Sequence, residues 1–163
     1  MKRILVLSDS HGNVNNMVPA VGRLHPDMII HLGDCWADAE QLHRKFPMTV
    51  MEQVPGNCDC RQEVQERILL IEGKKILICH GHTFNVKAGY LNLEYAAEER
   101  KVDAALFGHT HRVFYDKHNR ITYMNPGSIG QPPYGIPPSY GVLQVDGSSN
   151  TIATDVIYLE ENN

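Results

Sequence analysis

Five short polar segments of the sequence carry residue types that bind metal ions, and each follows an apolar run. One of them, Gly108-His109-Thr110-His111, follows the apolar residues 104–107. The other four contain Asp9 with His11, Asp34, Asn57, and His80 with His82. Carboxylates, an amide and imidazoles form a mixed oxygen and nitrogen set that suits Mn²⁺, Fe or Zn²⁺ better than Ca²⁺ or a thiolate metal. The set is too large for one ion and predicts two ions about 3.5–4 Å apart, bridged by one carboxylate.

Each of these residues, taken alone, has an ordinary structural explanation. Asp9 could cap a helix, Asp34 and Asn57 stand beside glycines and could be turn residues, and His80 could be a hydrogen-bonded histidine at a strand end. Their common position at the ends of apolar runs favours the metal site. The histidines outside these segments are interpreted as structural: His25, His31, His43 and His118.

The first half of the chain predicts the elements that would position these residues. Short apolar runs at 4–7, 28–32 and 49–54 are typical of buried strands. Apolar residues at helical spacing predict helices at 14–24 and 37–46. This alternation indicates a parallel α/β sheet. Open α/β sheets bind ligands at the carboxyl ends of their strands, so the polar segments should converge there.

The second half predicts hairpins and one further helix. Hairpins are expected at 67–79, around Gly73 and Lys74, at 113–124 and at 140–159, while residues 104–107 form a strand. A helix is expected at 88–101. The segment 125–140 holds five prolines and three glycines and predicts a rigid loop. The sequence has no internal repeat or linker, so we expect one domain over residues 1–163.

The composition limits the classes of function. A chain of 163 residues with a net charge of −4 fits a globular protein and argues against a nucleic-acid polymer as main partner. No apolar stretch approaches the roughly 20 residues of a membrane span, and the N-terminal apolar run is short, so a cytoplasmic protein is expected. The cysteines lack a C-x-x-C pair, and we expect free thiols at Cys35, Cys58, Cys60 and Cys79.

The five segments together resemble the signature of calcineurin-like metallophosphoesterases, which reads D-x-H, G-D, G-N-x-[DE], H and G-H-x-H. The matching blocks occur in the family's order and span most of the chain. They are Asp9-Ser10-His11, Gly33-Asp34, Gly56-Asn57-Cys58-Asp59, His80-Gly81-His82 and Gly108-His109-Thr110-His111. The short length and the Asn-Pro-Gly-Ser block at 125–128 resemble the small bacterial and archaeal phosphodiesterase branch.

The resemblance implies a fold, a cofactor and residue roles. The fold would be a two-sheet α/β sandwich with flanking helices and a dimetal site at one edge. The ligands of one ion would be Asp9, His11 and His111, those of the other Asn57, His80 and His109, and Asp34 would bridge them. The cofactor would be two divalent ions, with Mn²⁺ expected first and Fe, Zn²⁺ or Ni²⁺ as alternatives.

The implied chemistry is hydrolysis of a phosphate ester. The two ions would lower the pKa of a shared water, which attacks phosphorus in line. The candidate catalytic residues are Asp34, Asn57, Cys58 and His80. The role of His82 stays open, because the family fixes the first histidine of that block more firmly than the second. If the tetrapeptide at 108–111 is extended, both of its histidines face the ions.

Cys58 departs from the wider family, which has a histidine there to stabilise the phosphoryl group or protonate the leaving oxygen. A thiol carries no positive charge at neutral pH. Two divalent ions, two carboxylates and a hydroxide leave one net positive charge, which a diester monoanion neutralises and a monoester dianion exceeds. We therefore expect a preference for phosphodiesters and place Cys58 near the leaving group.

Several alternatives stay open. The same metal pair could serve a phosphomonoesterase, or the fold could be a non-catalytic metal-binding scaffold, as in the retromer subunit. The complete ligand set argues against the scaffold. Candidate substrates are cyclic nucleotides, small nucleotide diesters and glycerophosphodiesters. The loop 131–139 lacks the arginine that relatives often carry, and its role is open. That loop and the C-terminal hairpin are candidate contacts in a homo-oligomer.

Overall fold

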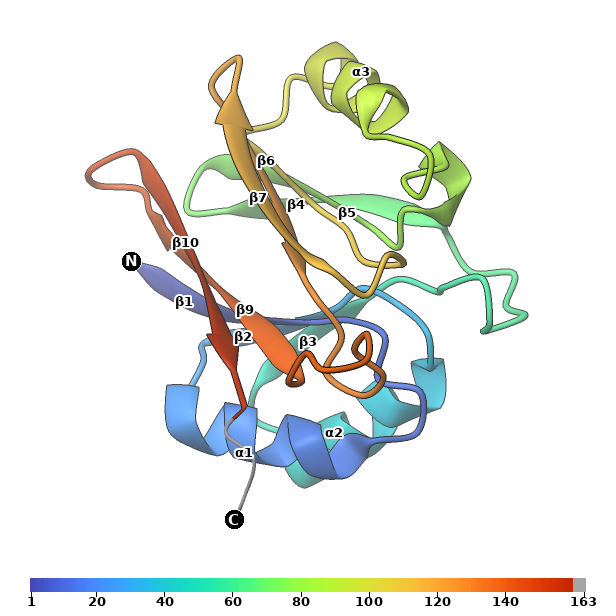
Figure 1. Ribbon diagram of the computed structural model, residues 1–163. Coiled ribbons are helices and arrows are strands. Elements are labelled where there is room, and N and C mark those ends of the chain that lie inside the picture. Colours follow the sequence, from blue (N-terminus) through green and yellow to red (C-terminus); the bar gives the residue numbers. More distant parts are fainter. Residues whose placement is uncertain (160–163) are drawn as a thin grey trace.

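Two β-sheets packed face to face form the centre of the molecule, and helices cover their outer faces (Figure 1). The structure is a computed structural model and describes residues 1–159. Each sheet has five strands. This arrangement confirms the two-sheet α/β sandwich with flanking helices.

The first sheet has the strand order β10-β9-β1-β2-β3. Its strands are β1 (Lys2–Leu7), β2 (Met28–His31), β3 (Val50–Gln53), β9 (Ser139–Asp146) and β10 (Thr151–Tyr158). Strands β1, β2 and β3 are parallel, whereas β9 runs antiparallel to both β1 and β10. Helices α1 (Val14–Leu24) and α2 (Trp36–Lys45) lie across the outer face of this sheet (Figure 1). The predicted parallel βαβαβ unit is thus confirmed.

The second sheet has the order β4-β5-β6-β8-β7. Its strands are β4 (Glu66–Ile71), β5 (Lys74–Cys79), β6 (Ala104–Leu106), β7 (Val113–His118) and β8 (Ile121–Pro126). The short helix η1 (His82–Phe84) and helix α3 (Leu91–Glu99) lie on its outer side. β4 and β5 form one hairpin and β7 and β8 another, while β5, β6 and β8 are parallel.

The period of two along the strands divides the apolar side chains between the layers. Ile4 and Val6 of β1 point between the sheets and pack with residues such as Ile78 and Leu106 of the second sheet. Leu5 and Leu7 point the other way, into the layer beneath α1 and α2. Strand β1 is therefore covered by the second sheet on one face and by helices on the other. Burial of both faces explains why residues 4–7 form a continuous apolar run.

Two sequence predictions were wrong in their bounds. The helix expected at 88–101 spans only Leu91–Glu99, because Gly89 has a φ of 153° that no helix accommodates. The loop expected from residue 125 begins later, because Asn125 and Pro126 end strand β8 and pair with β7. Within residues 1–159, no helix combines the length and the apolar character that crossing a bilayer requires.

Candidate metal centre

Loops at the carboxyl ends of β1, β2, β3, β5 and β6 meet at one edge of the sandwich. Backbone hydrogen bonds hold neighbouring loops together. The Asp9 amide donates to the Gly33 carbonyl at 3.0 Å, and the Gly108 amide donates to the His80 carbonyl at 2.9 Å. Segments that are up to 100 residues apart in sequence therefore lie side by side, as the strand ends predicted.

The predicted residues form two adjoining groups of potential ligands. In each group, one side-chain oxygen or nitrogen per residue lies within 4.8 Å of the others. The first group is Asp9, His11, Asp34 and His111, and the second is Asp34, His80 and His109. Asp34 belongs to both groups and therefore connects them.

Asp9 has one oxygen held by the protein and one that is free. Oδ2 accepts hydrogen bonds from the Ser8 hydroxyl at 2.6 Å and from the His109 amide at 3.0 Å. Oδ1 is buried without a hydrogen-bond partner in the described part of the chain. It lies 3.2 Å from His111 Nε2 and 3.8 Å from His80 Nε2. A buried carboxylate oxygen left without a donor among imidazole nitrogens fits a bound cation.

Two histidines are oriented by backbone carbonyls. His80 Nδ1 lies 2.8 Å from the Leu32 carbonyl oxygen, and His111 Nδ1 lies 2.6 Å from that of Gln131. A carbonyl accepts only, so each Nδ1 carries a proton, and in the neutral ring Nε2 is left with the lone pair. Both Nε2 atoms point toward the carboxylates of Asp9 and Asp34. This arrangement of a carbonyl behind the ring is typical of metal-binding histidines.

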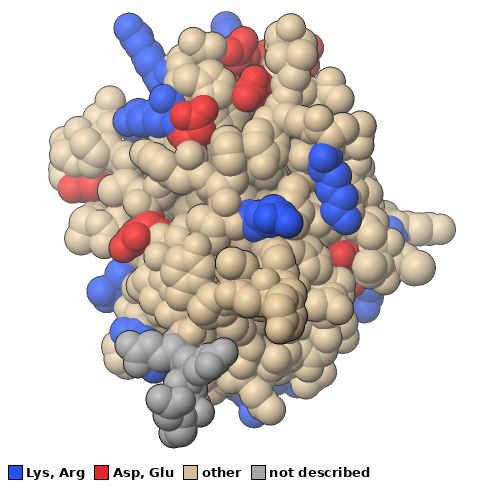
Figure 2. All heavy atoms as spheres, viewed as in Figure 1, with Lys and Arg blue, Asp and Glu red and all other residues tan. Residues whose placement is uncertain are grey.

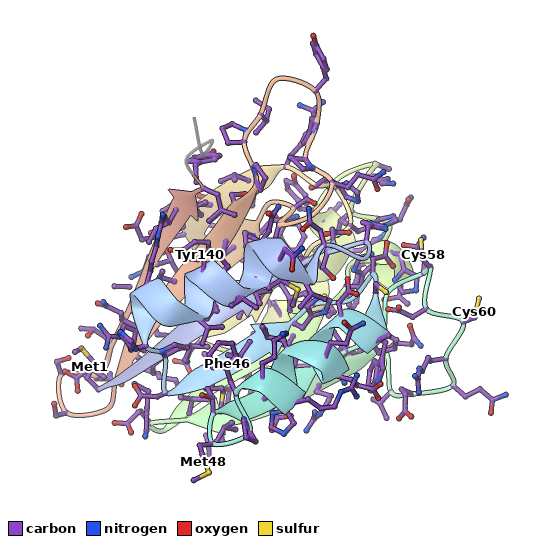
Figure 3. All side chains as sticks on the ribbon, turned by 90° about the horizontal axis from the view of Figure 1, so that it is seen from below. Met1, Phe46, Met48, Cys58, Cys60 and Tyr140 are labelled. Atoms are coloured by element: carbon purple, nitrogen blue, oxygen red, sulfur yellow. The ribbon has the colours of Figure 1, made fainter. Side chains whose placement is uncertain are left out.

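Asn57 lies beside His80. It is not a member of the two groups above, which contain only aspartates and histidines. Its side-chain Oδ1 lies 3.1 Å from His80 Nε2, and its side-chain Nδ2 donates to Cys58 Sγ at 3.4 Å. Asn57 and Cys58 are exposed. Figure 3 shows Cys58 and Cys60 on the loop after β3, at the end of the molecule opposite Met1.

Burial and mutual charge shift the pKa values of these groups in opposite directions. Burial would raise the pKa of Asp34, but the adjoining His80 ring and the Cys58 amide hold it below its ordinary value. Burial would lower the pKa of His80, but the carboxylates of Asp34 and Asp9 raise it. Burial and the charge of His80 lower the pKa of His109 to about 4. The carboxylates are therefore ionised and His109 is neutral at neutral pH, as metal binding requires.

Residues 108–111 do not take the extended course that was the condition for both histidines to face the same side. His109 has a φ of 68° and His111 a φ of 58°, so both are left-handed. The same conformation occurs at Asp9, His11 and Asp34. Left-handed backbone sends the two histidines of the tetrapeptide to different groups rather than to the same side of a strand. Such residues cost free energy of order 1–3 kcal/mol each and cluster at functional sites.

Gly108 is required by the closeness of two loops. A Cβ atom at this position would meet Ser8 Oγ and would lie 2.8 Å from Asp9 Oδ2. Glycine at this position therefore lets the backbone of residue 108 pass close to Ser8 and Asp9.

Asp59 and His31 position the centre, although the sequence analysis assigned neither of them a role in it. Asp59 accepts hydrogen bonds from the amides of Asp34, Trp36 and Gly56, at 3.0, 2.7 and 2.7 Å. His31 is fully buried; its Nδ1 accepts from the Gly33 amide and its Nε2 lies 3.0 Å from Ser10 Oγ. Asp59 is the acidic residue of the G-N-x-[DE] block, so the sequence contained a sign of its role. His31 lies in no signature block, and nothing in the sequence indicates its role.

His82 and Cys58 lie at the margin of the centre. The His82 ring is 5.4 Å from that of His80 and 6.0 Å from that of His109, and its buried Nδ1 has no partner within residues 1–159. Burial raises the pKa of the Cys58 thiol, and the adjacent Asp34 carboxylate raises it further. Cys58 is therefore a neutral group beside Asp34. All four cysteines are free thiols, as expected.

A pocket of about 200 Å³ adjoins the centre on the side of the proline-rich loop. His111 and Arg112 line it on one side, and Pro133, Ile136 and Tyr158 line the other. The loop 131–139 contains no arginine, but Arg112, the residue after His111, places a positive charge at this pocket.

Comparisons with known proteins agree with this geometry. The model of the calcineurin-like phosphoesterase superfamily domain matches residues 1–148. A probable metallophosphoesterase of Bacillus subtilis, YsnB, is 34% identical over 154 residues, covering 91% of this chain and 88% of that protein. The phosphodiesterase YfcE of Escherichia coli is 30% identical over 114 residues, covering 70% of this chain and 50% of that protein. The crystal structure of a predicted phosphoesterase from Streptococcus pneumoniae superposes with a TM-score of 0.78 at 27% identity, covering 96% of this chain and 89% of the other.

Proposed function

Because the chain belongs to the calcineurin-like phosphoesterase superfamily, we propose that it is a metal-dependent phosphodiesterase acting on small phosphodiesters at the candidate metal centre. The observation that carries the proposal is the free, buried Asp9 Oδ1 among three imidazole nitrogens. An ionised oxygen in this position is costly to bury unless a positive charge lies beside it, which a bound cation supplies.

Two ions account for the ligands better than one. Asp9, His11 and His111 would hold the first ion, Asn57, His80 and His109 the second, and Asp34 would bridge them. The two cations, when bound, supply an activated water and neutralise charge on the phosphoryl group. We propose Mn²⁺ as the native metal, with Fe, Zn²⁺ or Ni²⁺ as alternatives, because the ligands combine carboxylate, amide and imidazole.

The chain's own residues prepare the centre for these ions. The carbonyls of Leu32 and Gln131 keep His80 and His111 in the tautomer that offers Nε2. Ser8 fixes the rotamer of Asp9 by its hydrogen bond to Oδ2. The ligands are therefore oriented before any ion arrives, and little ordering remains to oppose binding.

Charge favours diesters over monoesters. Asp9 and Asp34 are ionised, and Cys58 contributes a neutral thiol where relatives in the wider family have a histidine. With two divalent ions and an ionised water, the centre carries one net positive charge, which matches a diester monoanion. A monoester dianion would leave excess negative charge in a partly buried site.

The setting of the reaction follows from the same features. The four free thiols suit a reducing compartment, so we place the enzyme in the cytoplasm. The net charge of −4 favours a small substrate over a nucleic-acid polymer. The pocket next to His111, with Arg112 and Tyr158 on its walls, has room for one substituent of a diester.

The test compares two chromogenic esters at equal metal loading. The protein is stripped with a chelator, reloaded with Mn²⁺, and assayed with bis-p-nitrophenyl phosphate and with p-nitrophenyl phosphate. We expect metal-dependent cleavage with the diester as the faster substrate, and loss of both activities in Asp34→Asn. Faster turnover of the monoester would overturn the diester preference. No turnover of either ester with Mn²⁺, Fe²⁺, Zn²⁺ or Ni²⁺ would favour a non-catalytic scaffold.

A further inference from the structure

A second polar pocket lies at the opposite end of the sandwich from the candidate metal centre. Its volume is about 390 Å³, and its lining includes Lys74, Asp103, Lys117, Arg120, Asn150 and Thr151. Lys74 begins strand β5, whereas His80 follows the last residue of that strand. Six residues of strand separate the two sites by roughly 20 Å. The pocket is therefore distinct from the metal centre.

Three hairpins bring the lining residues together. The turns of the β4–β5, β7–β8 and β9–β10 hairpins all lie at this end of the molecule (Figure 1). Gly147, in the β9–β10 turn, lies so close to the β4–β5 turn that a Cβ atom there would be 2.8 Å from the Glu72 carbonyl oxygen. The pocket walls thus come from both sheets, and contact between turns fixes their spacing.

The pocket carries uncompensated positive charge. Lys74 Nζ is 3.0 Å from Asp103 Oδ1, and this pair is neutral. No carboxylate of residues 1–159 lies within 4.0 Å of the Lys117 or Arg120 side-chain nitrogens. Glu72 and Asp146 lie nearby but face the N-terminal amine. Figure 2 shows Lys and Arg side chains beside Asp and Glu side chains at this end of the molecule (upper left). Lys117 and Arg120 thus place two cationic side chains without a paired carboxylate in one pocket, although the chain has a net charge of −4.

Arg120 stands in a backbone position that favours glycine. The β7–β8 turn has left-handed residues at both Asn119, with φ 48°, and Arg120, with φ 66°. A two-residue hairpin turn with this geometry prefers Asn-Gly, because a side chain at the second position is strained. Arg120 occupies this position despite the strain, and it lines the pocket. Strained backbone at a non-glycine residue is characteristic of functional positions.

We propose that this pocket binds a small phosphorylated ligand through its phosphate group. Lys117 and Arg120 together match a phosphate dianion, and the planar guanidinium suits two phosphate oxygens at once. Asn150 and Thr151 add neutral hydrogen-bonding groups at the rim. The volume lies within the range of small-molecule sites. The proposal is independent of the proposed hydrolysis, because no lining residue belongs to the metal centre.

Amide chemical-shift mapping tests the proposal on the whole chain. Inorganic phosphate is titrated into ¹⁵N-labelled protein, and adenosine 5′-monophosphate is titrated next as a larger ligand. Shifts at the metal loops and at residues 117–122 and 150–152 report on the two sites separately. We expect saturable shifts at the second set, with affinity about tenfold weaker in Arg120→Gly and in Lys117→Gln, as for loss of one charge-assisted hydrogen bond. Arg44→Gln, which removes an exposed charge from α2, should keep the wild-type affinity.

The variants also separate binding from folding and from hydrolysis. Arg120→Gly relieves the left-handed strain and should keep the thermal stability of the wild type. Its hydrolysis of bis-p-nitrophenyl phosphate should be unchanged. Shifts confined to the metal loops, shifts without saturation, or equal affinity in Arg120→Gly and Arg44→Gln would overturn the proposal. Binding of a single-stranded oligonucleotide far tighter than either small ligand would replace it with a nucleic-acid site.

Discussion

Asp9 Oδ1 lies 3.2 Å from His111 Nε2 and is buried without a hydrogen bond in the described part of the chain. The second oxygen of the same carboxylate accepts two hydrogen bonds. Ser8 and the His109 amide therefore fix the orientation of Asp9 and leave the other oxygen directed at the histidines. This asymmetry distinguishes a prepared ligand from a buried carboxylate that only stabilises the fold.

Replacing Asp9 with asparagine should abolish metal binding at the group of Asp9, His11 and His111 while keeping the fold. The asparagine oxygen can accept the hydrogen bonds of Ser8 and the His109 amide, but its amide group would then face the imidazoles and exclude a cation. We expect diesterase activity to fall by more than about 100-fold. Zn²⁺ at 100 times its Kd for that group should stabilise the wild type by about 2.7 kcal/mol through the group, and Asp9→Asn should lose this gain. Thermal denaturation with and without Zn²⁺ measures this difference.

Asp155→Asn, on the exposed side of β10, is the matched control and should respond to Zn²⁺ as the wild type does. Equal stabilisation of Asp9→Asn and the control by Zn²⁺ would exclude Asp9 as a ligand.

Asp59→Asn should weaken metal binding through the backbone of Asp34. Asp59 accepts three amide hydrogen bonds, including that of Asp34, and an asparagine would turn an N–H group toward at least one of these donors. An unpaired amide costs about 1–3 kcal/mol, and loss of such support typically lowers metal affinity 10- to 100-fold. Urea denaturation and metal titration measure the two effects.

Glu63→Gln removes a charge from the same loop without touching the centre and serves as control, because Glu63 is exposed. A variant that loses stability but binds metal with wild-type affinity would show that Asp59 supports the loop alone.

The positions of the ligands could be predicted because they depend on local sequence. A buried strand is apolar, and the residues that follow it at the carboxyl end are polar and carry the chemistry. The transitions from Leu7 to Asp9 and from Phe107 to His109 are visible in the sequence without any knowledge of the partner strands. Parallel pairing then brings these ends to one edge.

The conformation of the ligands depends on contacts between distant segments, which the sequence does not reveal. His109 is left-handed because its amide must reach Asp9, which lies 100 residues away. The tautomer of His80 depends on the Leu32 carbonyl, and that of His111 on Gln131. The extended course considered for 108–111 rests on strand periodicity alone, and that periodicity ends with β6 at Leu106.

Cys58→His should shift the enzyme toward monoesters. Cys58 follows Asn57, its backbone amide donates to Asp34 Oδ1 at 2.9 Å, and its side chain is exposed at the centre. An imidazolium at this position would add the positive charge that a monoester dianion requires. We expect the ratio of monoester to diester kcat/KM to rise at least tenfold, and more at pH 6 than at pH 8, because the added histidine is charged at the lower pH.

Cys60→His places the same side chain two residues away on the same exposed loop and should leave the ratio unchanged. If Cys58→His also leaves the ratio unchanged, Cys58 does not face the leaving group.

His31 should make the protein less stable in mild acid. The ring is fully buried between Gly33 and Ser10, and burial lowers its pKa to about 4, although Asp38 and Asp9 oppose the shift. In the unfolded chain the pKa returns to about 6.5. Between these values the unfolded chain binds a proton that the folded chain does not, so the free energy of unfolding decreases as the pH falls from about 6.5 to about 4. The full loss is about 3 kcal/mol.

His31→Gln isolates this contribution, because glutamine does not titrate. The variant should be less stable than the wild type at pH 7, since it loses ring hydrogen bonds, but its free energy of unfolding should fall less steeply toward pH 4.5. Urea denaturation at several pH values measures both slopes. His43→Gln, which removes an exposed histidine of α2, should keep the wild-type slope. Parallel slopes in all three proteins would mean that His31 is protonated in the folded state, and that the hydrogen bonds joining the Asp9 and Asp34 loops do not require a neutral ring.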